Sequence, residues 1–282
     1  MIYSVSKIQS DGCLVHVKFT RHGIEFKALP KKVLNWLPLI PGDFNQISGD
    51  TKPILTTKRM LMKKLIQTMA FLATGCLLLT FMAMKAKSKK IIFFGDSITQ
   101  QGVQPGGYVD LISKKLNSPA YEVIGAGIGG NKVYDLYLRL EDDVLNKKPD
   151  LVVIYIGVND VWHKQSSHTG TDLDKFVKFY QALIHKIQTN GAKVVVCTPA
   201  VIGEKKKGSN ELDAELDTYS AAIRELATKN KLVLCDLRKL FTEYDLKNNP
   251  QDLPKGILTT DGVHLNEKGN ETLAATLIPL VK

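Results

Sequence analysis

The chain has few cysteines, and their spacing matches no metal site or redox motif. Its 282 residues include four cysteines, Cys13, Cys76, Cys197 and Cys235, and no CxxC pair. This pattern argues against a disulfide framework and against a metal site. Cys197 and Cys235 end two apolar runs, where a cysteine is usually a small buried hydrophobe. A single bridge between these two stays open if the protein is exported.

Most of the chain, residues 91–282, has nearly equal numbers of positive and negative side chains. The formal net charge of +10 comes from residues 1–90, where 15 Lys and Arg stand against 4 Asp and Glu, a net charge of +11. Residues 91–282 carry 23 against 24, a net charge of −1, which gives no basic footprint for a nucleic acid. We therefore expect no nucleic-acid partner. A chain of this length with 44% apolar residues can form one sizeable α/β core.

One long apolar run is present near the N-terminus. Leu65 to Met84 comprises 20 uncharged and largely apolar residues, and lysines flank it on both sides. We interpret residues 60–89 as a signal peptide or a membrane anchor. No clean A-x-A cleavage site follows, and the basic flanks leave the orientation open. We expect a protein exported to the periplasm or cell envelope, either released or anchored through residues 65–84.

The position of this run is unusual, because a cleavable signal normally begins within a few residues of the initiator methionine. Met60 and Met62 lie where such an initiator would be. Residues 1–59 contain four scattered prolines and no sustained periodicity. One hypothesis is that this leader is an upstream extension from a misassigned start. The rival hypothesis is a small cytoplasmic segment that precedes a signal anchor.

From Lys90 onward, short β-branched runs alternate with amphipathic stretches, the pattern of a parallel sheet covered on both faces. Apolar stripes predict core-facing helices over residues 171–189 and 212–226, and a final helix over 267–278 that Pro279 ends. Five strands are predicted, at Ile91–Phe94, Glu122–Ile124, Leu151–Ile156, Lys193–Cys197 and Leu232–Asp236.

The first predicted strand leads directly into Gly95, Asp96 and Ser97. A serine is therefore expected just beyond the carboxyl end of a strand, where open α/β sheets bind their ligands. Asp and Ser are also preferred at helix N-caps. Taken alone, the tripeptide favours a cap over a nucleophile.

Two other predicted loops carry polar groups suited to acyl transfer. Asn159 follows the third strand and could donate its amide to a developing oxyanion, although an Asn-Asp pair is also common in turns. Asp261 and His264 lie three residues apart just before the final helix. A serine needs such a base, and the base works best when a carboxylate fixes its tautomer. Of the six histidines, only His264 has such an aspartate at a predicted loop-to-helix junction.

Residues 125–130 satisfy GxGxxG after a short strand, which could suggest dinucleotide binding. Two features argue against it. The first strand of the domain leads into residues 95–99 instead, and no acidic residue ends a strand about 20 residues later. A glycine here has another use, because its bare backbone N–H can approach a reacting carbonyl closely.

Together, and in this order, these four segments resemble the SGNH (GDSL) family of serine esterases over residues 90–282. The resemblance implies an α/β fold, a three-layer α/β/α sandwich with a flavodoxin-like parallel sheet of about five strands. It implies Ser97 as nucleophile, Asp261 and His264 as its activating pair, and an oxyanion hole of Ser97, Gly127 and Asn159. It implies no metal and no cofactor. Gly125 departs from the family, because many members carry an asparagine there that makes a supporting hydrogen bond.

The expected reaction is hydrolysis of a carboxylic ester through an acyl-enzyme, on acyl or acetyl esters of lipids or carbohydrates. The partner is then a small-molecule or glycan ester. One alternative is an O-acyltransferase that passes the acyl group to a sugar hydroxyl. The other is a non-catalytic ligand-binding module of the same fold. Loss of a catalytic residue would mark such a module, and all of them are present.

Overall fold

The structure is a computed structural model that describes residues 4–5, 16–20, 23–27, 60–69, 88–206 and 209–282. The chain divides into two compact units, residues 1–81 and 82–282. In the first unit, the strands β1 (Ser4–Val5), β2 (His16–Thr20) and β3 (Gly23–Lys27) form an antiparallel sheet in that order. The leader shows no sustained periodicity, and this small sheet was not predicted.

A helix covers residues 60–69. Most of the predicted signal peptide or anchor, residues 70–87, lies outside the described residues. Across the described part of the chain, none of the helices has both the length and the apolar character needed to cross a bilayer.

The second unit contains a parallel sheet of five strands in the order β5-β4-β6-β7-β8. This is the flavodoxin-like order, and it confirms the predicted fold class. All five predicted strands are present, within three residues at each end. They are β4 (Lys89–Gly95), β5 (Tyr121–Gly127), β6 (Leu151–Tyr155), β7 (Lys193–Cys197) and β8 (Val233–Cys235).

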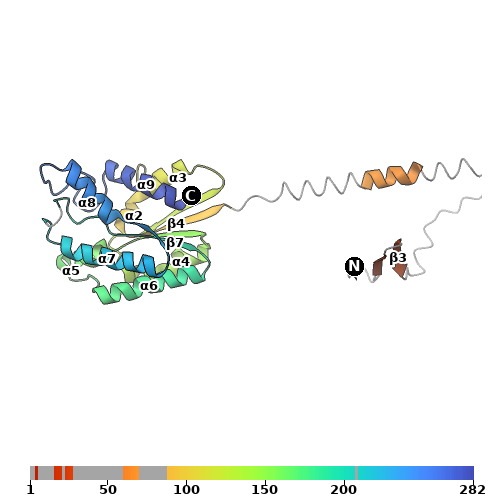
Figure 1. Ribbon diagram of the computed structural model, residues 1–282, viewed down its shortest axis with the longest axis horizontal. Coiled ribbons are helices and arrows are strands. Elements are labelled where there is room, and N and C mark those ends of the chain that lie inside the picture. Colours follow the sequence, from red (N-terminus) through yellow and green to blue (C-terminus); the bar gives the residue numbers. More distant parts are fainter. Residues whose placement is uncertain (1–3, 6–15, 21–22, 28–59, 70–87, 207–208) are drawn as a thin grey trace, which may run out of the picture. The chain divides into compact units, whose positions relative to one another are not determined.

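Helices cover both faces of this sheet, as Figure 1 shows. On one face lie α2 (Ser97–Gly102), α3 (Tyr108–Lys115), α8 (Leu237–Asn248) and α9 (Glu267–Val281). On the other lie α4 (Val133–Asp143), α5 (Val158–Ser166), α6 (Leu173–Thr189) and α7 (Asp213–Lys229), with a short 3₁₀ turn at Leu145–Lys147.

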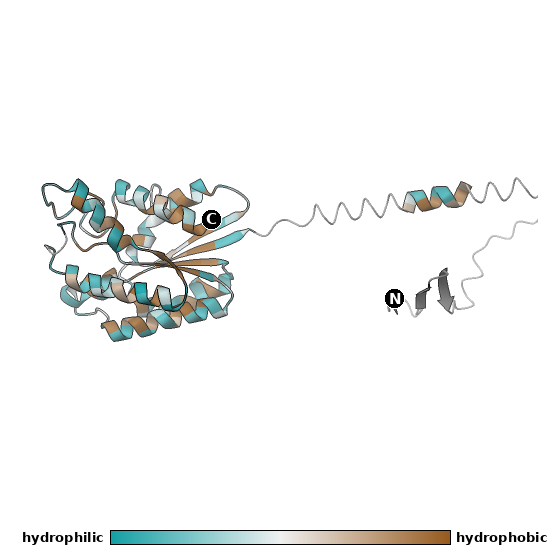
Figure 2. Cartoon of the chain, viewed as in Figure 1, coloured by the Kyte–Doolittle hydropathy of each residue, from teal (hydrophilic) through white to brown (hydrophobic). Residues whose placement is uncertain are grey.

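Alternating side chains of the central strand build two separate cores. Ile91 and Phe93 of β4 are fully buried against the α3, α8 and α9 side, whereas Ile92 and Phe94 are fully buried against the α4, α6 and α7 side. Successive side chains of a strand point to opposite faces, so an uninterrupted apolar run is buried on both. Figure 2 shows these strands as the most hydrophobic layer of the sandwich.

The last helix runs past the predicted end at Pro279, so that prediction was wrong. Helix α9 continues to Val281 with Pro279 inside its last turn. Two contacts support this turn. Val281 is fully buried in the core, and Lys89 Nζ donates hydrogen bonds of 2.9 Å to the carbonyls of Val281 and Lys282. Burial and capping of the free carbonyls outweigh the N–H that proline lacks.

The two strand cysteines are buried free thiols. Cys197 and Cys235 are register partners on β7 and β8, and neither forms a disulfide. Burial raises the pKa of the Cys197 thiol well above its ordinary value, and the neighbouring Cys235 adds to this rise. Both cysteines pack as small apolar residues.

We predict that a chain beginning at Lys87 folds like the full chain, because it keeps all of β4 and the Lys89 contacts. Its melting temperature should lie within about 2 °C of that of the second unit in the full chain, measured by circular dichroism. A chain beginning at Ile92 is the matched control. It lacks Lys89 and the buried Ile91 and should melt at least about 5 °C lower. Failure of the Lys87 chain to fold would show that the leader is structural.

Candidate active site

Ser97 lies at the carboxyl edge of the sheet, at the first residue of α2. Strand β4 ends at Gly95, and Asp96 caps the helix, its Oδ1 accepting a 3.0 Å hydrogen bond from the Ile98 amide. The cap predicted for this tripeptide is therefore present at Asp96. It leaves the Ser97 hydroxyl free, and Ser97 Oγ lies 2.9 Å from Nε2 of His264.

Asp261 and His264 lie on the loop before α9 and contact each other directly. Asp261 Oδ2 is 2.7 Å from His264 Nδ1, while Oδ1 accepts the backbone amides of Val263 and His264 at 2.9 and 2.8 Å. Partial burial alone raises the pKa of Asp261, but these hydrogen bonds outweigh burial and hold it below its ordinary value. Asp261 therefore stays ionised beside an imidazole whose other nitrogen faces Ser97.

A buried carboxylate holds the chain just before this pair. Glu204 is fully buried, and its two oxygens accept the backbone amides of Ile257, Leu258 and Thr259 at 2.8, 2.6 and 2.7 Å. Three N–H donors compensate the burial of a charge that would otherwise be costly. No sequence signal pointed to Glu204, because its partners are backbone groups more than fifty residues away.

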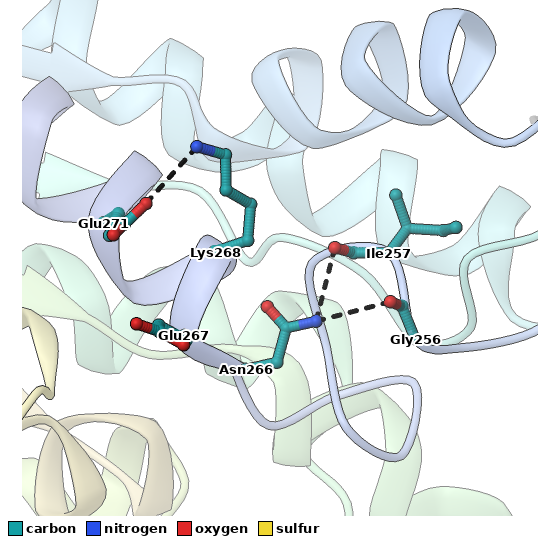
Figure 3. A pocket seen from close by; sticks show the side chains of 6 residues that line it. All are labelled: Gly256, Ile257, Asn266, Glu267, Lys268 and Glu271. Atoms are coloured by element: carbon teal, nitrogen blue, oxygen red, sulfur yellow. Dashed lines mark hydrogen bonds and ion pairs between the residues drawn. The ribbon is translucent and has the colours of Figure 1, made fainter.

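Asn266 fixes the same loop from the side of α9. Its Oδ1 accepts the Gly269 amide, and its Nδ2 donates to the carbonyls of Ile257 and Gly256 at 3.2 and 3.5 Å. Asn266 is also one of the residues that line an open hollow of about 510 Å³, and Figure 3 shows its hydrogen bonds to Gly256 and Ile257. None of the predicted catalytic residues lines this hollow, which is formed by Gly256, Ile257, Asn266, Glu267, Lys268 and Glu271.

Gly127 ends β5 in close contact with the turn that carries Ser97. In the sheet register Gly127 lies opposite Gly95, and a Cβ on Gly127 would stand 2.1 Å from the Gln100 nitrogen and 2.7 Å from the Asp96 carbonyl oxygen. Only glycine fits so near another backbone segment. The following loop is fixed to α2, because Gly129 donates its amide to Gln100 Oε1 at 2.9 Å.

Asn159 follows β6, the strand on the other side of β4. The chain turns from β6 into α5 at Gly157, whose φ of +128° is unfavourable for any other residue. Asn159 is buried, and its Nδ2 donates to the Asn131 carbonyl at 3.1 Å. A side-chain amide has two hydrogens, so one remains to donate to a ligand. The structure thus brings the segments of Ser97, Gly127 and Asn159 to adjacent strand ends.

Two buried aspartates flank these segments. Burial raises the pKa of Asp96 to about 7, against the hydrogen bond from Ile98 and with help from the charge of Asp160. Burial likewise raises the pKa of Asp160 to about 6. Asp160 accepts the Val133 amide with both oxygens, at 3.2 and 3.3 Å, and so ties α5 to the start of α4.

Position 125, where the family resemblance raised a question, packs closely against the side chain of Val103. A Cβ on Gly125 would lie 2.1 Å from Cγ1 of Val103. Glycine therefore fits the neighbouring packing, and the supporting bonds to this strand come from other residues. Within the described residues, no cluster of three or more His, Cys, Asp or Glu could hold a metal ion.

The fold and these motifs define a family. The chain belongs to the GDSL-like Lipase/Acylhydrolase family, which it matches over residues 93–272. It is a carboxylic ester hydrolase of that family.

Three proteins illustrate what the chain is similar to. The crystal structure of the acetyl xylan esterase AlAXEase is 58% identical and superposes with a TM-score of 0.67, covering 68% of this chain and 100% of that one. The acetylxylan esterase of Geobacillus stearothermophilus is 27% identical over 209 residues, 67% of this chain and 92% of the relative. The uncharacterized lipoprotein YqeF of Bacillus subtilis is 24% identical over 169 residues, 52% of this chain and 68% of the relative.

The raised pKa of Asp96 predicts a pH dependence of stability. Between pH about 4 and 7 the unfolded chain has lost the Asp96 proton while the folded chain keeps it. The free energy of unfolding therefore falls as pH rises through this window, by up to about 1.4 kcal/mol per pH unit, and levels off above it. Asp96→Asn keeps an oxygen for the Ile98 amide but cannot ionise, so it should remove this contribution.

Urea denaturation at pH 5 and pH 8 measures the effect. The loss of stability between the two should be smaller in Asp96→Asn than in the wild type. Asp142→Asn, at an exposed position of α4, is the control and should retain the wild-type difference. Equal losses in all three proteins would contradict the assignment of a buried, protonated Asp96.

Proposed function

We propose that this esterase removes acetyl groups from acetylated xylan or xylo-oligosaccharides through an acyl-enzyme on Ser97. The observation that carries the substrate is the 58% identity to an acetyl xylan esterase along the whole of that chain. The Geobacillus relative, named for the same activity, supports the same substrate class. The contacts among Ser97, His264 and Asp261 support the mechanism.

In the first half-reaction, Ser97 Oγ attacks the carbonyl carbon of the acetyl ester while His264 Nε2, 2.9 Å away, takes its proton. The negative charge on the carbonyl oxygen is accepted by the backbone amides of Ser97 and Gly127 and by the Asn159 side chain. The bond to the sugar oxygen then breaks, and His264 gives the proton to that oxygen. Asp261 holds the imidazole tautomer and stabilises its protonated form.

In the second half-reaction, His264 takes a proton from water as the water oxygen attacks the acetyl carbon. The bond to Ser97 Oγ breaks, the serine regains its proton, and acetate leaves. The donors that stabilise the first tetrahedral intermediate serve the second one as well.

We also propose that the enzyme is exported to the cell envelope, with residues 60–89 as its signal peptide or anchor and residues 90–282 as the hydrolase domain. The apolar run Leu65 to Met84 supports export. So does the likeness to YqeF, which is named a lipoprotein.

Substitution of the proposed triad tests whether Ser97, Asp261 and His264 act together in catalysis or only form a helix cap and a loop. Ser97→Ala and His264→Ala should each lower kcat at least about 10³-fold, and the double variant should be little worse than either, because the residues act together. Asp261→Asn should cost as much as about 10⁴-fold, since it favours the wrong tautomer. His185→Ala, at an exposed position of α6, is the matched control and should keep wild-type kcat.

These variants are assayed on an aryl acetate across pH, with circular dichroism to confirm folding. Wild-type kcat/KM should rise with pH as the base loses its proton, because only neutral imidazole accepts the serine proton. Wild-type turnover in folded Ser97→Ala would remove the nucleophile and the mechanism together.

The substrate proposal predicts a preference for short acyl groups. Across aryl acetate, butyrate and octanoate, kcat/KM should be highest for the acetate, by about tenfold or more over the octanoate. Acetate released from acetylated xylo-oligosaccharide should exceed that from an acetylated glycerol at equal ester concentration. A faster octanoate would place the enzyme among lipid esterases. Transfer of acetyl to added sugar in place of acetate release would make it an acyltransferase.

A further inference from the structure

One arginine connects the three segments that adjoin the proposed oxyanion donors. Arg139 lies on α4, and its side chain is 14% exposed. Its Nη2 donates to the Gly95 carbonyl at 2.7 Å, Nη1 and Nη2 both donate to the Ala126 carbonyl at 3.1 Å, and Nε donates to Asn131 Oδ1 at 2.7 Å. No sequence motif pointed to this residue.

Each of these acceptors is placed next to one of the donors. Gly95 is two residues before Ser97, and Ala126 immediately precedes Gly127. Asn131 accepts the Asn159 side chain at its backbone carbonyl, 3.1 Å away, while Arg139 holds its side chain. We propose that Arg139 is a positioning residue that fixes and polarises the oxyanion donors during ester hydrolysis. This inference rests on the proposed function.

The contact with Ala126 acts on Gly127 electronically as well as sterically. The Ala126 carbonyl and the Gly127 N–H belong to one peptide unit. When a charged donor binds the oxygen of that unit, its N–H becomes a stronger donor, because hydrogen bonds in a chain polarise one another. Gly127 should then bind an oxyanion more tightly than a neutral carbonyl, and such an interaction lowers the barrier of the chemical step.

The geometry requires a guanidinium. A rigid planar fork can donate along several directions at once, whereas an ammonium is a point charge on a flexible stem. Two further contacts fix the fork, a 2.6 Å ion pair between Nη1 and Asp143 and the Phe94 ring 4.5 Å below Cζ. Neither His264 nor Asp261 is among the partners of Arg139, so its effect should spare the proton relay.

Arg139→Met and Arg139→Lys test the proposal in the full chain. Met retains an aliphatic cover for Phe94 without a donor, and its kcat on an aryl acetate should fall about 10- to 100-fold with KM within about twofold. A lysine can donate to only some of the acceptors of Arg139, so kcat of Arg139→Lys should fall about 3- to 10-fold. Arg224→Met is the matched control, because Arg224 makes a two-point ion pair with Asp236 away from these segments. It should keep wild-type kcat.

Two readouts separate this role from general loss of structure. The pH midpoint of kcat/KM should stay at the wild-type value, because the Ser97 to His264 contact is not altered. Phenylboronic acid forms a tetrahedral adduct with a serine nucleophile, so its inhibition constant should rise by about the same factor as kcat falls. Inhibition by acetate, which lacks the tetrahedral charge, should change little.

Wild-type kcat in folded Arg139→Met overturns the assignment. So does a fall in kcat that leaves phenylboronic acid affinity unchanged, or one that shifts the pH midpoint. If Arg139→Met does not fold, Arg139→Lys decides, and wild-type kcat there overturns the assignment equally. The proposed function fails by a different result, ester hydrolysis that persists in Ser97→Ala, and the Arg139 assignment would fail with it.

Discussion

The position of β4 between β5 and β6 is the constraint on which the candidate site depends. Carboxyl ends of parallel strands lie at one edge of a sheet, and Gly95 is the register partner of both Gly127 and Tyr155. The sheet register therefore brings Ser97 and Asn159, more than sixty positions apart in the sequence, to neighbouring strand ends. The two cores pack against β4 from both faces and so fix the strand that carries the Ser97 turn.

The histidine loop has no such strand to position it and is held by polar contacts together with the burial of Leu258, Val263 and Leu265 in the core. The carboxylate of Glu204 and the side chain of Asn266 bind its backbone, and Thr259 and Leu265 form an isolated antiparallel bridge. A buried carboxylate lowers the free energy of folding only when every oxygen is satisfied. Two of the buried acids, Glu204 and Asp96, bind the backbone of segments that adjoin the proposed catalytic residues.

Sequence patterns predicted the sheet, which the structure confirms, and also the proposed triad, because both depend on local chemistry. An apolar, β-branched run such as Val194 to Cys197 is typical of a strand buried on both faces. The pair Asp261 and His264 is informative through its place in the ordered set of motifs. Long-range polar contacts leave no such trace. Arg139 and Glu204 bind backbone atoms, which every residue offers, so composition and periodicity do not mark them. The predicted helix end at Pro279 was wrong because the burial of Val281 in the core outweighs the tendency of proline to end a helix.

The loop after β5 is supported from the α4 side of the sheet and receives no side-chain support from Gly125. A strand residue can support its own loop only if a side chain fits there, and Val103 occupies that space. Arg139, on α4 at the opposite face of the sheet, donates its guanidinium N–H groups to the carbonyls of Gly95 and Ala126. A donor anchored on a helix is held by that helix's own packing, here the fully buried Leu136 and Leu140 on either side of Arg139. The precision of the proposed oxyanion hole is thus set by how well α4 packs against the sheet, and core substitutions in α4 should affect turnover as well as stability.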